Sequence, residues 1–485
     1  MTSPFLDLVA QRVVVYDGAT GTWLQTQHLT ADDFGGEALE GCNEYLAITR
    51  PDTVAALHSA YFEVGADVVE TNTFGSLAIP LGEYGMADRS HEITLANARI
   101  ARQVADDFST PDRKRFVAGS MGPGTKSPSL GQIRFVELRD AYEIQAAALL
   151  EGGVDLFLFE THFDLLAMKA AIIGSRRAMA SAGRQVPIQA QVTMELTGRM
   201  LLGTEIGAAL AAIDPLHVDV IGINCATGPA EMSEHLRHLS QHSRVPISCL
   251  PNAGLPSVVD GAMHYDLTAE DFVAHQTRFI ADFGVQVVGG CCGTTPEFIA
   301  GLVEATRGIE VAPRNPVHEP SATSIYSAVS LDQDTAFLGI GERTNANGSK
   351  KFRENMIDAD WDACLKMATE QVKEGAHILD VCVDYVGRDG AADMEEIASR
   401  FATQVNAPLM VDSTEANVVE AALQWIGGRP ILNSVNLEDG DAPGTRFDKF
   451  LSLARDYGAA VVCTCIDEQG QARDRDWKLR AATQI

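Results

Sequence analysis

Residues 285–296 read Val-Gln-Val-Val-Gly-Gly-Cys-Cys-Gly-Thr-Thr-Pro, an apolar run that ends in glycines and a pair of cysteines. The apolar part predicts a short buried strand. Thr295 can cap the helix that follows, with Pro296 as its first residue. A strand that passes directly into a helix is the repeating unit of α/β proteins, which keep their chemistry at such strand ends. Cys291 and Cys292 cannot bond to each other without strain, so we expect them to bind a metal.

The same strand-to-helix unit recurs through the first 305 residues. Eight short segments rich in Val, Ile and Phe predict strands: 13–18, 67–74, 115–123, 156–163, 187–194, 218–225, 245–254 and 285–293. Several intervening helical patterns end in glycine just before the next strand. Near-continuous apolar strands separated by helices imply a parallel sheet covered on both faces. Eight such units in about 300 residues predict a (β/α)₈ TIM barrel, with an open doubly wound sheet as the alternative.

The rhythm breaks at residues 308–334, where three prolines fall among polar residues, and this predicts an interdomain linker. The alternation then resumes with five more strand candidates: 337–344, 377–385, 408–414, 430–437 and 459–467. A closed barrel needs three further units, roughly 100 residues at this spacing. The sequence therefore predicts a barrel at 1–307, a linker at 308–334 and a second, incomplete (β/α) barrel at 335–485, truncated after about five strands. The chain reads as a fragment, or as one cut inside its second domain.

Composition limits the possible classes of protein. Hydrophobic residues make up 46% of the 485 residues and charged ones 21%, as in a soluble globular protein. The net charge of −29 argues against broad electrostatic binding to nucleic acid or to an anionic membrane. No apolar run could span a bilayer, and the N-terminus lacks a signal-peptide pattern. Nine cysteines without a compact spacing framework fit a reducing compartment, and we expect the cytoplasm.

Three cysteines form the metal-site candidate. Cys225 falls at the end of the sixth predicted strand, and Cys291 and Cys292 fall at the end of the eighth. These ends lie close together in a closed barrel, with one strand between them. Zn²⁺ suits three thiolates, and the fourth position would be open to a substrate atom. If that atom is a thiol, zinc lowers its pKa and makes the thiolate a nucleophile. The alternative is that all three are buried core cysteines.

The motifs around these cysteines resemble the homocysteine S-methyltransferase family. The resemblance rests on Gly-Gly-Cys-Cys-Gly-Thr-Thr-Pro at 289–296, Gly-Ile-Asn-Cys at 222–225, Asp-Gly-Ala-Thr-Gly-Thr at 17–22 and Gly-Ala-Asp-Val-Val-Glu-Thr-Asn-Thr-Phe at 65–74. It covers essentially all of residues 10–305. It implies a zinc-dependent barrel that binds homocysteine and methylates its sulfur. The family's zinc ligands carry over to the three cysteines named above.

Other strand ends offer candidates for contacts with homocysteine. Glu160 ends the fourth strand, and a carboxylate at that mouth could hold the ammonium group of an amino acid. Asp17 is a second candidate for the same role. Asn252 ends the seventh strand, between the two cysteine-bearing strands, and could fill the fourth zinc position before substrate arrives. Thr193 is similarly placed. The alternative for the acids is structural: capping of the next helix or pairing with a basic neighbour.

Three histidines share one predicted helix. The spacing of His235, His238 and His242 puts them near one helix face. They could mimic a metal site, but the segment is polar and rich in Ser and Arg. We therefore expect an exposed helix face.

Polar side chains also gather at the strand ends of the second series. The candidates are Glu342, Asn345, Asp380, Asp384, Asp412, Asn433 and Asp467. A ring of acids and amides at one barrel mouth suits a polar heterocycle with several N–H donors, such as a pterin. Ordinary strand-end capping could account for about half of them.

The second series resembles the pterin-binding (folate) domain of the cobalamin-dependent methionine synthase family. The matching stretches are Gly-Glu-Arg-Thr-Asn at 341–345, Ile-Leu-Asp-Val at 378–381, Leu-Met-Val-Asp-Ser-Thr at 409–414 and Leu-Asn-Ser at 432–434. That family also places a homocysteine barrel before a folate barrel. The resemblance implies pterin contacts by Asp380, Asp412 and Asn433. Cys382 stands where the family usually has Asn, and a thiol cannot act as an amide's donor and acceptor together.

The two resemblances together imply a methyltransferase of the methionine synthase type. Zinc would hold the homocysteine thiolate, methylcobalamin would supply the methyl group, and 5-methyltetrahydrofolate would replenish it at the second barrel. The family's cobalamin motif, Asp-x-His-x-x-Gly, is not found, so cobalamin would sit on an absent C-terminal region or on another chain. One alternative is a zinc enzyme that uses betaine or S-methylmethionine directly. The other is a non-catalytic scaffold with structural zinc, for which four protein ligands are usual.

Overall fold

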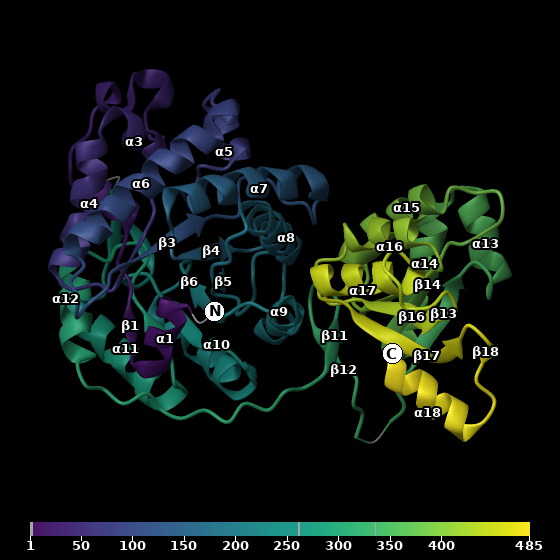
Figure 1. Cartoon of the computed structure of the whole chain (residues 1–485). Helices are drawn as coiled ribbons and strands as arrows, with labels where there is room; N and C mark the ends of the chain where they lie inside the picture. Colours follow the sequence, from purple (N-terminus) through teal and green to yellow (C-terminus); the bar gives the residue numbers. More distant parts are fainter. Residues whose placement is uncertain (1–2, 260–261, 335) are drawn as a thin grey trace.

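The computed structural model describes residues 3–259, 262–334 and 336–485. Two α/β domains lie side by side, and residues 306–330 run between them (Figure 1). Helices α8 and α9 of the first domain face the second domain in this view. No helix in the described ranges is long and apolar enough to cross a membrane.

The first domain is a closed barrel of eight parallel strands. The strands are β1 (Val14–Val15), β2 (Val68–Glu70), β3 (Phe116–Met121), β4 (Leu156–His162), β5 (Ile188–Val192), β6 (Val220–Asn224), β7 (Ile247–Leu250) and β10 (Val287–Val288). Each strand pairs with its neighbours in barrel order, and a parallel bridge between Tyr16 and Val68 joins β1 to β2. All eight predicted strands are confirmed, each within its predicted range. The open doubly wound sheet is wrong, because the sheet closes.

Helices lie around this barrel and across one of its ends. They are α1 (Pro4–Gln11), α2 (Thr20–Gln25), α3 (Leu46–Thr49), α4 (Pro51–Glu63), α5 (Ala78–Glu83), α6 (Ser90–Phe108), α7 (Phe135–Gly152), α8 (Leu165–Ala182), α9 (Ile206–Ile213), α10 (Pro229–His242), α11 (Ala269–Phe283) and α12 (Pro296–Ala305). Short 3₁₀ turns are η1 (Ala31–Phe34), η2 (Glu37–Leu39), η3 (Asn43–Tyr45), η4 (Ala87–Arg89) and η5 (Asp214–Leu216). Thr295 is the extended residue before α12, as predicted, although its side chain makes no capping hydrogen bond.

The barrel core is packed, and one end of it is sealed by the N-terminal helix. Phe5 and Val9 of α1 pack against strand residues that include Val14 and Leu158. Burial of Phe5 and Val9 removes two large apolar side chains from water, which contributes about 1.5–3 kcal/mol each. The opposite end of the barrel, where the strands have their C-terminal ends, carries the cavity described below.

Two antiparallel hairpins were not among the predicted elements. One consists of β8 (Pro256–Val259) and β9 (Ala262–Tyr265), between β7 and α11. The other consists of β11 (Ser321–Thr323) and β12 (Ala328–Ser330), within the predicted linker. The backbone N–H of Thr323 donates to the carbonyl of Arg429 at 3.0 Å, so this part of the linker is attached to the second domain. The domain limits 1–307, 308–334 and 335–485 stay a prediction.

The second domain is an open, mostly parallel sheet. Its strands follow chain order: β13 (Ile340–Asn345), β14 (Ile378–Cys382), β15 (Leu409–Asp412), β16 (Ile431–Leu437), β17 (Ala460–Asp467) and the short antiparallel β18 (Gly470–Gln471). Its helices are α13 (Lys350–Ile357), α14 (Trp361–Lys373), α15 (Gly390–Gln404), α16 (Ala416–Leu423), α17 (Arg446–Tyr457) and α18 (Arg475–Gln484). All five predicted strands are confirmed. Since no pairing joins β13 to β17 or β18 within the described residues, the barrel is incomplete, as predicted.

The two domains meet through polar and aromatic contacts. The ammonium of Lys169 on α8 donates to the carbonyl of Ile426 at 3.0 Å and to that of Gly428. The rings of Phe135 and Tyr457 have centroids 5.4 Å apart. Lys169 is only 1% exposed, so the interface excludes water around its charge.

Candidate functional site

Three cysteine sulfurs converge at the strand-end mouth of the first barrel. Cys225 follows β6, while Cys291 and Cys292 follow β10, with β7 between these strands. Their sulfurs all lie within 4.8 Å of one another, and the Cys225 and Cys292 sulfurs are 3.9 Å apart. Tetrahedral zinc with bonds of about 2.3 Å separates two sulfur ligands by about 3.8 Å. The trio therefore fits Zn²⁺ with a fourth position free.

The local backbone explains why the sulfurs meet. Cys225 has a φ of 58°, a left-handed conformation that turns its side chain out of the strand direction. Gly290 leaves no room for a side chain, because a β-carbon there would lie 2.2 Å from the Thr294 hydroxyl oxygen. The amide N–H of Cys291 donates to the carbonyl of Pro251 at 2.8 Å, which holds the cysteine loop to the end of β7.

Contacts among the three thiols shift the pKa values of Cys291 and Cys292 in opposite directions. Hydrogen bonds donated by the thiols of Cys225 and Cys291 lower the pKa of Cys292. Hydrogen bonds with Cys225 and Cys292, together with burial, raise the pKa of Cys291. Thiol ligands bind a metal as thiolates, so metal binding at these three cysteines would release protons.

Three carboxylates lie at the same mouth, of which Asp17 and Glu160 are buried and Glu70 is partly buried. Asp17 follows β1, Glu70 ends β2 and Glu160 lies near the end of β4. Burial, and then neighbouring negative charge, raises the pKa of Glu70 well above its usual value. Burial also raises the pKa of Asp17, and it raises the pKa of Glu160 to about 7. One oxygen of Asp17 accepts from the Glu70 N–H at 2.9 Å, while the other is buried without a partner among the described residues. The cluster favours a cationic ligand.

A cavity of about 410 Å³ joins the sulfurs and the acids. It is lined by Gly18, Ala19, Thr20, Gly21, Thr22, Asn43, Glu44, Glu70, Thr71, Asn72, Phe74, Ser120, Glu160, Thr161, Cys225, Gly290, Cys291 and Cys292. Of the predicted homocysteine contacts, Glu160 lines this cavity. Asp17 does not line the cavity, but its carboxylate accepts a hydrogen bond from the backbone N–H of Glu70, which does. Thr193 and Asn252 are buried at 4% and 3% exposure but do not line it.

Sequence reasoning missed four residues that shape this site. Glu70 stood inside a quoted motif but was given no role. Asn224 stands next to the predicted metal ligand Cys225, but no role was assigned to it from the sequence. Ser120, whose hydroxyl donates to the Glu160 carboxylate, carried no sequence signal. Thr161 has a φ of 58°, which no residue pattern indicates for a threonine.

The second domain brings together part of its predicted set. The amide of Asn345 donates to the carboxylates of Asp380 at 2.8 Å and Asp412 at 3.0 Å. Burial raises the pKa of Asp380, and its Oδ1 atom is buried without a partner among the described residues. Burial and the charge of Asp380 raise the pKa of Asp412 to about 6. The buried Asp380 and the partly buried Asp412, bridged by the Asn345 amide, can accept hydrogen bonds from a ligand with several N–H groups.

The other predicted pterin contacts make no hydrogen bond to this group among the described residues. Asp467 accepts from the indole N–H of Trp477 at 2.5 Å and from the Gln469 N–H at 2.9 Å. Glu342 is exposed on β13. Cys382 is buried, and its sulfur accepts from the side-chain amide of Asn347 at 3.6 Å. Burial raises the pKa of the Cys382 thiol to about 12, so it stays protonated.

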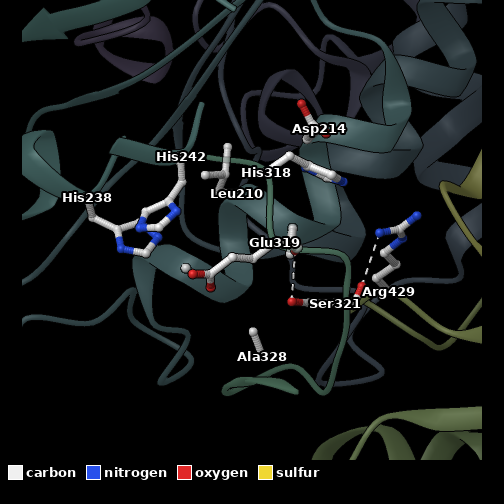
Figure 2. A pocket seen from close by; sticks show the side chains of 11 residues that line it. Leu210, Asp214, His238, His242, His318, Glu319, Ser321, Ala328 and Arg429 are labelled. Carbon is white, nitrogen blue, oxygen red and sulfur yellow. Dashed lines mark hydrogen bonds between the residues drawn. The ribbon is translucent and has the colours of Figure 1, made fainter. Parts of the chain in front are cut away.

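A separate small cavity, of about 80 Å³, lies between the domains beside α10 (Figure 2). His238 and His242 stand side by side there, with ring centroids 4.5 Å apart, and the linker passes over them. The Nδ1 atom of His242 lies 3.0 Å from the Val317 carbonyl oxygen. The prediction of an exposed face is therefore wrong: His235, His238 and His242 are partly buried, and the linker and α9 pack beside His238 and His242. Burial lowers the pKa of His238.

Comparisons with known proteins agree with this division. Residues 14–306 match the family described as Homocysteine S-methyltransferase, and residues 341–484 match the family described as Pterin binding enzyme. The chain is 55% identical over 480 residues to a methionine synthase of Mycobacterium tuberculosis and 54% identical over 485 residues to one of Mycobacterium leprae. Each alignment covers 99% of this chain and 40% of the relative, so the chain spans about two fifths of their length. The solved homocysteine methyltransferase MmuM of Escherichia coli, in its metallated form, is 20% identical with a TM-score of 0.47, over 60% of this chain and 96% of that one.

Proposed function

This chain belongs to the homocysteine S-methyltransferase family, and from that membership we propose that it methylates the sulfur of homocysteine in a methionine synthase reaction. The observation that carries the proposal is the cavity that three cysteine residues line together with the carboxylates of Glu70 and Glu160. Homocysteine carries a thiol at one end and an ammonium group at the other. The cavity offers a partner for each.

The sulfur end of the proposal concerns Cys225, Cys291 and Cys292. We assign these three residues as ligands of Zn²⁺, since their spacing suits tetrahedral thiolate coordination. Zinc bound there would lower the pKa of a substrate thiol, which makes the thiolate available at neutral pH. The ligands themselves leave one coordination position for that sulfur.

The ammonium end concerns Glu160, with Asp17 and Glu70 beside it. A carboxylate in a dry site gains most from a charged partner, because hydrogen bonds to ions are strong there. The unpartnered oxygen of Asp17 supports a donor arriving with the ligand. Thr193 and Asn252 stay predicted contacts, with Asn252 as the fourth zinc ligand before substrate binding.

For the second domain we propose 5-methyltetrahydrofolate as the ligand. Asn345, Asp380, Asp412 and Asn433 would hold its pterin ring, and the match to pterin-binding enzymes supports this. Glu342 and Asp467 stay predictions. The methyl group would reach homocysteine from methylcobalamin, bound by a module in the relatives' remaining length or on another chain. Direct use of betaine or S-methylmethionine would leave the pterin-binding domain without a purpose.

We also place the chain in the cytoplasm. All nine of its cysteines are described and none is in a disulfide, which fits a reducing compartment.

Metal content and homocysteine binding test the proposal. Wild type and Cys292→Ala are compared by metal analysis and by calorimetric titration with homocysteine in two buffers of different ionisation enthalpy. We expect one zinc ion per wild-type chain and a proton released when homocysteine binds, because the thiol becomes a thiolate. Cys292→Ala should lose both.

The matched control is Cys249→Ala. Cys249 is a fully buried free cysteine on β7 whose sulfur contacts Met232 instead of the trio. This variant should keep its zinc and its proton release. A wild-type chain that binds no zinc, or homocysteine binding without proton release, contradicts the proposed reaction.

A further inference from the structure

One buried amide connects the two ends of the cavity. Asn224 is the last residue of β6, fully buried and adjacent to Cys225. Its amide nitrogen lies 3.4 Å from a carboxylate oxygen of Glu160 and 3.9 Å from the sulfur of Cys291. It also donates to the hydroxyl of Thr161 at 2.8 Å. The side chain thus touches a carboxylate from β4 and a cysteine from the loop after β10.

The same side chain fixes an unfavourable backbone. Thr161 has a φ of 58°, a left-handed conformation that is an outlier for a β-branched residue. The pairing of β4 with β5 shifts register between Phe159 and His162, so the strand bulges at this point. The oxygen of Asn224 accepts from the Thr161 N–H at 2.7 Å. The Asn224 amide thus accepts one hydrogen bond from Thr161 and donates another to it. These two bonds hold the bulge that directs Glu160 into the mouth.

Only an amide has both kinds of atom that this position needs. The acceptor oxygen is committed to the Thr161 N–H, and one amide hydrogen is committed to the Thr161 hydroxyl. The second hydrogen then faces two groups that carry negative charge in the active form, the Glu160 carboxylate and the Cys291 sulfur. Aspartate has the same shape but donates nothing, and it would add a third negative charge.

We propose that Asn224 is a positioning residue that sets the distance between the ammonium-binding carboxylate of Glu160 and the sulfur of Cys291. This inference rests on the proposed function, since it assigns Asn224 to the same homocysteine site. Asn224 acts through its neighbours Glu160, Thr161 and Cys291. Residues at such positions around metal ligands change metal affinity or activity by about 10–100-fold when they are replaced.

The test uses Asn224→Ala and Asn224→Asp in the full chain. Homocysteine affinity is measured by titration, and the geometry of the trio is measured by the thiolate-to-cobalt absorption band after Co²⁺ is substituted for zinc. We expect both variants to bind one metal ion per chain, because the three sulfurs remain. Homocysteine affinity should fall about 10–100-fold, and the cobalt band should shift.

A double variant separates positioning from folding. Thr161→Gly removes the penalty for positive φ, so Thr161→Gly/Asn224→Ala should recover the thermal stability that Asn224→Ala loses. It should still bind homocysteine weakly, since nothing then ties Glu160 to Cys291. Recovery of homocysteine affinity together with stability would overturn the inference, because the role of Asn224 would then be structural alone.

Gln371→Ala is the matched control. The Gln371 amide is 3% exposed in the second domain, accepts from the Arg343 N–H at 2.7 Å and donates to the Thr344 hydroxyl at 3.3 Å. It should lower stability and leave homocysteine affinity and the cobalt band unchanged. Wild-type homocysteine affinity in both Asn224 variants overturns the inference and leaves the proposed function standing. A wild-type chain without zinc overturns both.

Discussion

At the scale of single residues, close backbone packing places the proposed metal ligands. Gly222 lies on β6, three residues before Cys225, and faces Ser248 on β7. A β-carbon at Gly222 would lie 2.0 Å from the Ser248 hydroxyl oxygen and 2.2 Å from its backbone oxygen. The hydroxyl can rotate away, but the backbone cannot, so β6 and β7 would have to separate.

We therefore expect Gly222→Ala to destabilise the chain. The cost should be about 1–3 kcal/mol, as for overpacked cores, and zinc content should fall because Cys225 moves with its strand. Chemical denaturation followed by circular dichroism and metal analysis checks both effects. Gly21→Ala is the control, since a β-carbon there meets nothing within 4 Å. Equal stability of the two variants would contradict this reading.

At the scale of elements, α8 is held to the barrel mouth by its first residues. Asp164 precedes the helix, is 1% exposed, and accepts from the Leu166 N–H at 2.8 Å as a cap. The same carboxylate accepts from the hydroxyl groups of Ser127 at 2.5 Å and Ser129 at 2.7 Å. One side chain thus caps a helix and fastens the loop after β3.

Asp164→Ala should cost more than an ordinary helix cap. Loss of a cap alone costs about 0.5–2 kcal/mol, and each buried hydroxyl left unpaired adds about 1–3 kcal/mol. Asp389→Ala provides the comparison, because Asp389 caps α15 at an exposed position through the Ala392 N–H at 3.1 Å. Equilibrium denaturation should show the larger loss for Asp164→Ala. The explanation fails if the two losses are equal.

At the scale of the whole molecule, a buried lysine joins the two domains. Burial, and then the charge of Arg429, lowers the pKa of Lys169 to about 7. The unfolded chain keeps a lysine pKa near its ordinary value of about 10.4. Between these values the unfolded state binds a proton that the folded state has released, so stability rises with pH. Below the folded pKa both states are protonated, and the contribution is constant.

Lys169→Met should remove this pH dependence. The thermal midpoint of wild type should rise from pH 7 toward pH 10 relative to that of the variant, measured by calorimetry at matched ionic strength. The variant should also lose about 1–3 kcal/mol at all pH values, because the carbonyls of Ile426 and Gly428 are left unpaired. Parallel pH profiles of the two proteins would show that Lys169 does not titrate in this range.

The sequence by itself determined the α/β alternation, the eight strands of the first barrel, the five of the second series and the meeting of the three cysteines. These features rest on local signals: apolar runs, helix caps, and motifs whose residues are neighbours in the chain. Parallel strands point the same way, so residues at their ends meet at one mouth whichever side chains they carry. That is why Cys225, Cys291, Cys292 and Glu160 could be placed together in advance.

Only the tertiary structure decided which polar groups share the cavity. Glu70, Ser120 and Thr161 line it, and Thr193 and Asn252 do not, because side-chain direction depends on register and on bulges such as the one at Thr161. The partial burial of the three α10 histidines likewise depends on a linker that is distant in sequence. These outcomes follow from packing between remote segments, since a periodic pattern records only which face of an element is buried and not what covers it.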